Sequence, residues 1–173
     1  MTQTIKFTKV RDVKSPVRGT SQAAGIDFFV PNFSSEFLVD LIKKNPFVKC
    51  SIDDDNMHIC IPANGKVLIP SGIKTFMSTD SALIGANKSG IASKKGLVFG
   101  AHVIDSDYSG EIHINVINTT SNDVIVSSGE KLIQFIHTPV ILSSLEEIDT
   151  PEYEDLHLNS VRGEGGFGST GTK

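Results

Sequence analysis

The sequence predicts an all-β fold, either a barrel or a sandwich, and two observations support this fold class. Short runs rich in β-branched residues recur along the chain, as in residues 66–70, 124–128 and 131–142. Turn signals also follow one another, roughly every ten residues: Asn64-Gly65, Ser71-Gly72, Ser109-Gly110 and Ser128-Gly129. This spacing favours consecutive strands over alternating strands and helices.

The length and charge of the chain restrict what it can be. A chain of 173 residues is expected to form one domain with a substantial core. The formal net charge of −4 argues against nucleic acid as a partner, because binding to a duplex needs a broad basic surface. Residues 1–10 contain no apolar run of signal-peptide length, and no segment is long and apolar enough to span a membrane. We therefore expect a cytoplasmic protein that does not bind membranes.

Two of the expected strands carry a single polar residue among apolar ones. In residues 23–31 (AAGIDFFVP), Asp27 has apolar neighbours, so it is expected at a strand end or buried with partners. In residues 129–136 (GEKLIQFI), Gln134 is a lone amide in an apolar strand. Satisfied core polar groups and ligand contacts explain both residues equally well.

Residues 32–60 break the strand pattern and predict an insertion between two strands. Ser34 can cap a helix over residues 34–45, which Pro46 would end. Four apolar residues recur in it at helical spacing: Phe37, Leu38, Leu41 and Ile42. The polar residues 53–56 then indicate a surface turn. We expect one short helix here, and binding of an unknown protein partner is one role that the insertion could serve.

Residues 111–118 (EIHINVIN) give the clearest strand signal in the chain. Apolar and other residues alternate, so Ile112, Ile114 and Val116 should share one face and His113 should lie on the other.

Two stretches carry groups that could do chemistry. Residues 104–111 (IDSDYSGE) place Asp105 and Asp107 next to Tyr108, which fits either a solvated hairpin turn or a carboxylate base beside an aromatic wall. Residues 87–96 (NKSGIASKKG) can present an ammonium, a hydroxyl and exposed backbone N–H groups to a phosphate. The alternative for that second stretch is a polar loop with scattered lysines.

The apolar periodicity fades from about residue 149. Residues 1–149 are therefore expected to form the β domain, and residues 150–173 a flexible C-terminal arm. Near the end of the arm, residues 162–171 (RGEGGFGSTG) lack the flanking strand and helix of a known phosphate loop. Their Arg, hydroxyls and single Phe still suit a phosphate and a stacked base. The alternative is a disordered linker.

Five stretches, taken in order, resemble the five motifs of the homotrimeric dUTP pyrophosphatase family. They are AAGIDFF, NKSGIA, GAHVIDSDYSGE, GEKLIQFI and RGEGGFGSTG, and they span residues 23–171. The resemblance implies a jelly-roll-like, distorted β-barrel and a homotrimer whose active sites are shared between subunits. It also implies hydrolysis of dUTP to dUMP and pyrophosphate with Mg²⁺ on the triphosphate. Such an activity keeps uracil out of DNA and supplies dUMP for dTTP synthesis.

The resemblance assigns roles to individual residues. Asp105 would be the catalytic carboxylate that activates the attacking water at the α-phosphorus, with Gln134 near the phosphate and the water. Asp27 would support the metal indirectly, through water and phosphate. The substrate contacts would be the following: Lys88, Ser89, Gly90, Phe99, Gly100, Ala101, His102, Val103, Ile104, Asp105, Tyr108, His113, Arg162, Phe167, Gly168, Ser169 and Thr170.

Within this set, the two ends of the nucleotide have different contacts in the family. Tyr108 would pack against deoxyribose, where a 2′-hydroxyl would clash, and backbone groups of residues 99–105 and His113 would pair with uracil. Residues 162–170 would belong to an arm that closes the site of a neighbouring subunit.

Several features depart from the family pattern. Lys88 stands where Arg is usual, which keeps the charge but loses the planar fork. His102 stands where Gly is common, which would be costly if the backbone there needs a positive φ. Ser109 replaces a frequent Arg or Gln, and residues 32–60 are longer than the family norm. Two other functions stay open: a dCTP deaminase-like enzyme of the same fold, and a trimeric regulatory or binding protein that acts through the inserted helix.

Overall fold

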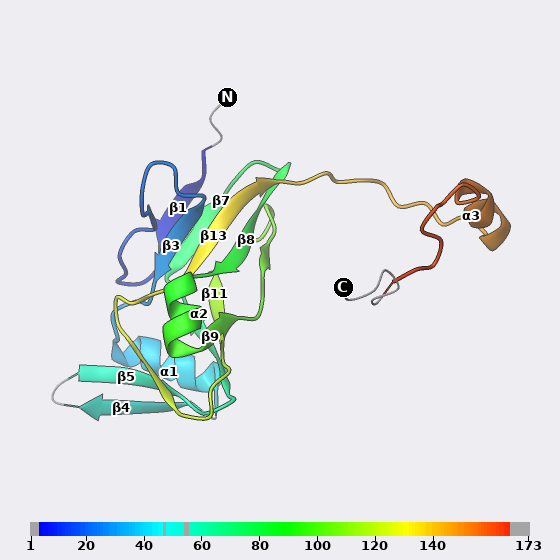
Figure 1. The fold of residues 1–173 in the computed structure, drawn as a ribbon. Coiled ribbons are helices and arrows are strands. Elements are labelled where there is room, and N and C mark those ends of the chain that lie inside the picture. Colours follow the sequence, from blue (N-terminus) through cyan, green and yellow to red (C-terminus); the bar gives the residue numbers. More distant parts are fainter. Residues whose placement is uncertain (1–3, 47, 54–55, 167–173) are drawn as a thin grey trace. The chain divides into compact units, whose positions relative to one another are not determined.

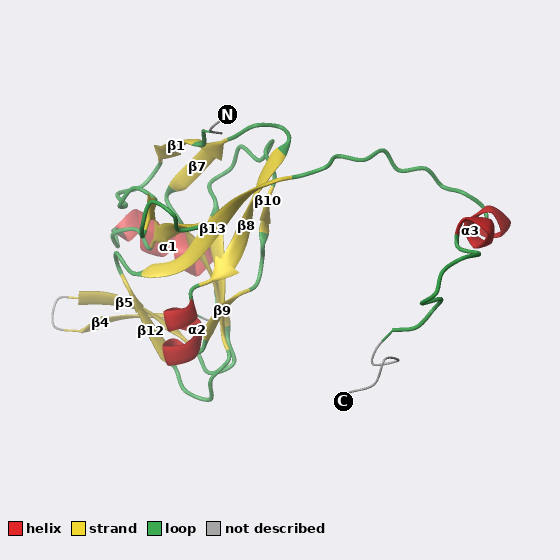
Figure 2. Ribbon diagram, turned by 45° about the horizontal axis from the view of Figure 1, so that its top comes forward, coloured by secondary structure: helices red, strands yellow, loops and turns green. Residues whose placement is uncertain are grey.

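The computed structural model describes residues 4–46, 48–53 and 56–166, and the chain divides into two compact units. The first unit extends to Ile141 and the second begins at Leu142. Strands dominate the first unit, with short helices between them (Figure 1, Figure 2). The all-β fold class is therefore confirmed.

All strand pairs in the described ranges are antiparallel, and the largest sheet has the order β10-β8-β13-β3-β2. Its strands have these bounds: β2 (Val17–Arg18), β3 (Gly25–Phe29), β8 (Ser81–Asn87), β10 (Val103–Ile104) and β13 (Lys131–Pro139). Figure 1 shows β13 between β3 and β8, at the centre of this sheet.

Three smaller sheets complete the first unit in the orders β1-β7, β6-β11-β9 and β12-β5-β4. Their strands have these bounds: β1 (Lys6–Lys9), β4 (Lys49–Asp53), β5 (Asn56–Ile61), β6 (Lys66–Pro70), β7 (Ile73–Phe76), β9 (Leu97–Phe99), β11 (His113–Asn118) and β12 (Val124–Ser127). The predicted alternation in β11 is confirmed, since Ile114 and Val116 are buried and His113 and Ile117 are half-buried.

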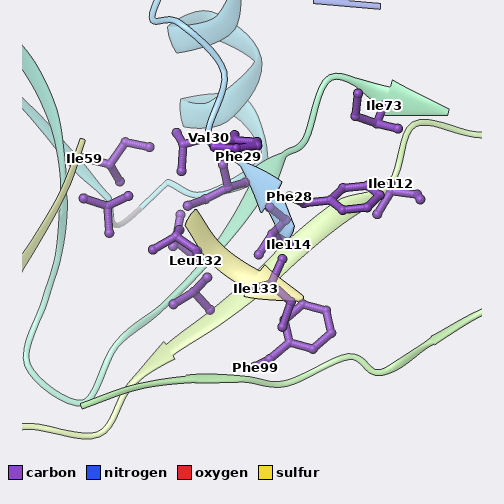
Figure 3. Close-up of a cluster of buried hydrophobic side chains, with 14 of the residues drawn as sticks. Phe28, Phe29, Val30, Ile59, Ile73, Phe99, Ile112, Ile114, Leu132 and Ile133 are labelled. Carbon is purple, nitrogen blue, oxygen red and sulfur yellow. The ribbon is translucent and has the colours of Figure 1, made fainter. Parts of the chain in front are cut away.

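The hydrophobic core gathers side chains from several sheets and from one helix. Figure 3 shows ten of them, labelled, among them Phe28, Phe99 and Ile114. The ring of Phe135, which is fully buried, packs edge-on against Phe28 at 4.8 Å and Phe99 at 5.8 Å between centroids. This packing attaches β3 and β9 to the central strand β13.

The predicted helix in the insertion is present as α1 (Ser35–Lys44). Ser34 caps it, because its hydroxyl oxygen accepts a hydrogen bond from the Phe37 N–H at 3.1 Å. Phe37 and Leu41 are buried in the core, at 1% and 0% exposure, so this helix is anchored to the β structure.

The rest of the insertion differs from the sequence prediction. Strands β4 and β5 form a hairpin where we expected a polar turn at residues 53–56 and no strands, and β5 also pairs with β12. Part of the predicted turn, residues 54–55, lies outside the described residues. The strands were missed because residues 49–53 are too short and too mixed in polarity to show a period.

Two further short helices correct the expectation of a single one. Helix α2 (Ser89–Lys95) forms where we considered a polar loop, and it ends at Gly96 in the left-handed conformation with φ 61°. Helix α3 (Thr150–Leu156) lies in the second unit, where we expected no regular structure. Asp149 caps α3 by accepting from the Glu152 N–H at 2.9 Å, a start signal that we overlooked. None of the helices in the described ranges has the length and apolar character needed to cross a bilayer.

Candidate active site

Two of the predicted site residues, Asp27 and Gln134, lie directly opposite each other. Asp27 is on β3, Gln134 is on β13, and the two are partners in the register of that strand pair. The Gln134 amide donates a hydrogen bond to the backbone carbonyl of Asn87 at 3.0 Å. Residues far apart in the sequence therefore meet across three neighbouring strands, β3, β13 and β8.

The buried carboxylate of Asp27 forms ion pairs with two lysines. Lys88 contacts its Oδ1 atom, and Lys131 lies 3.1 Å from its Oδ2 atom. Burial alone raises the pKa of this carboxyl, but the hydrogen bonds and charges of the two lysines outweigh it, so the pKa of Asp27 lies below its ordinary value. The group is a carboxylate shared by two ammonium groups, which together carry a net positive charge.

Lys131 is a member of this cluster that the sequence analysis missed. It lies three positions before Gln134, which in a regular strand would put the two on opposite faces. The register of β13 shifts between Lys131 and Ile133, and this irregularity changes the alternation. A bulge of this kind has no sequence signal that periodicity can detect.

Ser89 and Gly90 follow Lys88 in the first turn of α2 and are exposed. A Cβ atom added at Gly90 would meet nothing within 4 Å, so the space in front of this turn is open. The arrangement leaves room for an anion next to Lys88.

The predicted uracil hairpin begins at the buried Phe99 of β9 and continues through Gly100, Ala101 and His102 into Val103 and Ile104 of β10. The imidazole Nδ1 of His102 donates to the Gly85 carbonyl at 2.8 Å, and the His102 carbonyl accepts from the Gly85 N–H at 2.6 Å. Among the described non-glycine residues only Asn64 has a positive φ. His102 does not adopt a positive φ, so the condition for a backbone cost is not met, and its side chain attaches the hairpin to β8.

Asp105 and Tyr108 lie in the turn after β10, and both are exposed. The Tyr108 hydroxyl donates to the backbone carbonyl of Glu111 at 3.0 Å. The same carbonyl also accepts from Nδ1 of His113 at 2.8 Å. One backbone oxygen thus receives both the tyrosine and the histidine that the resemblance places at the nucleoside.

A polar cleft of about 620 Å³ lies beside this hairpin and was not predicted. Its lining includes Glu111 and His113 from the hairpin, Asp40 and Lys44 from α1, and Arg11 from the segment after β1. Glu111 and Arg11 contact each other although they are 100 positions apart. Sequence spacing gives no signal for such a contact.

The two halves of the candidate site lie at opposite ends of β8. Ile104, just before Asp105, pairs with Leu83, whereas Lys88 follows the other end of the strand. The five steps from Leu83 to Lys88 span about 16 Å at roughly 3.3 Å per residue. The lysine–carboxylate cluster and the Asp105 hairpin are therefore not brought together within one chain.

In the second unit, Arg162 is exposed and its Nε donates to the Gly165 carbonyl at 2.7 Å. The other predicted arm residues, Phe167, Gly168, Ser169 and Thr170, lie outside the described residues.

The described residues do not form a metal cage of their own. No group of three or more His, Cys, Asp or Glu side chains in the described ranges is arranged to hold an ion. Both oxygens of Asp27 already contact lysines. The donor set therefore fits Mg²⁺ only if the ion is carried by a phosphate ligand, which is a common mode of Mg²⁺ binding.

Comparison with known proteins gives consistent matches. Residues 56–171 match the dUTPase family model, and this range begins at the first residue of β5. The deoxyuridine 5'-triphosphate nucleotidohydrolase of Debaryomyces hansenii is 35% identical over 165 residues, which cover 95% of this chain and 85% of that protein. The protein of the same name from Paramecium bursaria Chlorella virus 1 is 33% identical over 164 residues, covering 94% and 93%.

A solved structure is similar over almost the whole chain. The dUTPase of Staphylococcus bacteriophage 80alpha with dUPNHPP has a TM-score of 0.74 at 20% identity, covering 98% of this chain and 99% of that one. At this identity the likeness establishes a common fold.

Proposed function

The chain belongs to the dUTPase family, and we propose that it hydrolyses dUTP to dUMP and pyrophosphate. One structural observation supports this proposal most directly: the Asp27 carboxylate is shared by Lys88 and Lys131 and lies opposite Gln134. Two ammonium groups around one carboxylate leave a net positive charge, which suits the phosphates of a nucleotide. In the cell this reaction would keep uracil out of DNA and supply dUMP for dTTP synthesis.

In the proposed reaction Asp105 accepts a proton from the water that attacks the α-phosphorus. The attack forms a bond between the water oxygen and this phosphorus and breaks the bond to the bridging oxygen of pyrophosphate. Asp105 is exposed in its turn, so water and phosphate can reach it. Gln134 would orient a phosphate oxygen or the water from β13.

The nucleoside would bind at the hairpin. Tyr108 would pack against deoxyribose, and backbone groups of residues 99–105 and His113 would pair with uracil. A rigid set of backbone donors and acceptors can reject cytosine by mismatch and thymine through its methyl group. Lys88, Ser89 and Gly90 would contact phosphate oxygens at the open start of α2.

Mg²⁺ bound to the triphosphate would neutralise part of its charge and orient its oxygens. Asp27 would act on this assembly indirectly. By holding Lys88 and Lys131, it fixes two cations that can face the phosphates, and it leaves the metal to the nucleotide.

The proposed active unit is a homotrimer with shared sites. The distance of about 16 Å between the two halves of the site, along β8 at roughly 3.3 Å per residue, supports this proposal, because another copy can supply the missing half. The body would comprise residues 1–149 with the insertion at about 32–60, and residues 150–173 would form the arm. Arg162, Phe167, Gly168, Ser169 and Thr170 of that arm would close over a neighbouring subunit's site.

A comparison of substrates tests the proposed function. With Mg²⁺ present, pyrophosphate release should be fast from dUTP and at least about a hundredfold slower from dTTP, dCTP and UTP. Ammonia release from dCTP would instead identify a deaminase. Nucleotide binding without turnover by an intact oligomer would favour a regulatory protein.

A further inference from the structure

We propose that the inserted helix α1 positions the nucleoside end of the active site, with Arg11 and Glu111 as its positioning residues. This inference rests on the proposed function, because it concerns how the same site holds its substrate. Four observations carry it, and together they join α1, Arg11 and the hairpin that holds Tyr108.

The first observation is that α1 is fixed to the body at both ends. Phe37 and Leu41 lie in the core, and the amide of Asn45 bonds to β6 in two directions. Its Nδ2 donates to the Leu68 carbonyl at 2.9 Å, and its Oδ1 accepts from the Leu68 N–H at 2.7 Å. The Asn45 amide thus makes the same pair of hydrogen bonds to Leu68 that the backbone of a neighbouring strand would make at this edge of the sheet, and these bonds hold the end of α1 in place.

The second observation is a charged bridge from α1 to the hairpin. Asp40 of α1 lies 2.5 Å from Nη2 of Arg11, and Arg11 donates to both carboxylate oxygens of Glu111, at 2.7 and 2.9 Å. The hydrogen bonds to Glu111 raise the pKa of Arg11 against the effect of burial. The planar guanidinium is suited to such a two-pronged contact, which fixes direction as well as distance.

The third observation is a second route between the same elements. Lys44, one turn after Asp40 on α1, lies 2.8 Å from Nε2 of His113 and 3.2 Å from Asp40. Nδ1 of His113 donates to the Glu111 carbonyl, so Nε2 is free to accept from the lysine. Asp40, Arg11, Glu111, His113 and Lys44 therefore close a ring of contacts between the helix and the hairpin.

The fourth observation is that Tyr108 is bonded to Glu111, a member of this set of contacts. Its hydroxyl bonds to the same Glu111 carbonyl, and its ring lies so close to Gly110 that a Cβ atom there would be 2.4 Å from the hydroxyl oxygen. The Glu111 carboxylate is also held by the Gly72 N–H at 2.7 Å. Fixing Glu111 therefore fixes the position of the tyrosine that faces the deoxyribose in the proposed function.

Tyrosine fluorescence gives a direct test, because the chain has no tryptophan and only two tyrosines, Tyr108 and Tyr153. In a Tyr153→Phe background, Tyr108 is the remaining emitter. Arg11→Met should make Tyr108 more accessible to acrylamide quenching and should raise the Kd for dUMP and the KM for dUTP about tenfold, with kcat within about threefold. A split between KM and kcat is the signature of positioning at the nucleoside end, since a general loss of folded protein would lower kcat.

Two matched controls separate positioning from charge and from stability. Lys43→Met removes a cation from the same helix next to Lys44, and Lys95→Met removes the ion pair with Glu130 elsewhere in the unit. Lys95→Met should lower Tm without changing KM, and Lys43→Met should change neither. Arg11→Lys should restore only part of the dUMP affinity, because an ammonium cannot reproduce the fork.

If Arg11→Met does not fold, Asp40→Asn and Lys44→Met decide the question, because they leave the Arg11–Glu111 contact in place. Each should weaken dUMP binding about threefold. Unchanged quenching of Tyr108 and unchanged dUMP affinity in the folded variants would overturn the positioning role. Failure of the proposed function would look different, since the unaltered chain would then release no pyrophosphate from dUTP, while acrylamide quenching would still report on the ring.

Discussion

Gln134 packs against Gly25 so closely that a Cβ atom on Gly25 would lie 2.1 Å from the Gln134 side-chain oxygen and 2.9 Å from its Cβ. This close approach lets the amide lie opposite Asp27 and reach the Asn87 carbonyl. The single glycine of the AAGIDFF stretch is therefore required by the lack of space for a side chain, since its φ lies outside the left-handed region.

Gly25→Ala should consequently damage both stability and activity. The added methyl must displace the Gln134 side chain near its own Cβ, where it cannot rotate away, at a cost of about 1 to 3 kcal/mol. Denaturant unfolding and kcat/KM for dUTP measure the two effects. Gly19→Ala is the matched control, because a Cβ at Gly19 meets nothing within 4 Å and this residue lies outside the proposed site. An unaltered midpoint and activity in Gly25→Ala would show that the strands separate to accommodate the methyl.

The sequence predicted local features well and contacts across the sheet poorly. Helix α1 follows from the spacing of Phe37 and Leu41 and from the Ser34 cap, all within one segment. The meeting of Asp27 with Lys131 depends on a register shift in β13, and the contact of Arg11 with Glu111 joins residues 100 positions apart. Neither a bulge nor a pairing between distant segments produces a periodic pattern, so only the three-dimensional arrangement reveals them.

The Asp27 cluster predicts a specific pH dependence of stability. The pKa of the Asp27 carboxyl in the folded chain lies below the unperturbed value of 3.8. Well above pH 3.8 the carboxylate is therefore ionised in both the folded and the unfolded chain. Its stabilising contribution is therefore complete at neutral pH and is lost as the pH falls below 3.8 and through the lower pKa of the folded state.

Asp27→Asn should be less stable than the unaltered protein by about 1 to 3 kcal/mol at pH 7, because two lysines lose their partner. The difference should stay constant from about pH 8 to 5 and shrink below about pH 4. Urea unfolding of both proteins over this range measures it, and common contributions of other groups cancel in the difference. A gap that widens on acidification would contradict the assignment.

The arm should matter for catalysis and little for folding. The buried core lies between Val13 and Phe135, in the first unit, so truncation after Val161 should leave circular dichroism and Tm almost unchanged. Because the truncation removes Arg162 and the predicted contacts up to Thr170, kcat/KM should fall about a hundredfold or more. Truncation after Thr170 retains those contacts and is the matched control. Full activity after removal of residues 162–173 would show that the arm is dispensable.

Asp105→Asn should bind dUTP but hydrolyse it very slowly. The amide keeps the size of the side chain but cannot accept the proton, so kcat should fall by about 10²- to 10⁴-fold while KM changes little. Asp107→Asn, in the same exposed turn, is the control and should retain most of the activity. Near-normal kcat in Asp105→Asn would assign the general base to another residue.

The separation of the two halves along β8 predicts complementation between inactive chains. Lys88→Met should impair the phosphate end of the site and Asp105→Asn the water-activating end, and each variant alone should be nearly inactive. If each site takes these ends from different subunits, unfolding the two variants together in equal amounts and refolding them should rebuild about a quarter of the sites with both ends intact. Activity should therefore rise well above that of either variant, and size-exclusion chromatography should show the same oligomer throughout. Mixtures that stay as inactive as their components would mean that both ends of a site come from one chain, which would require the hairpin to move toward Lys88 when the nucleotide binds.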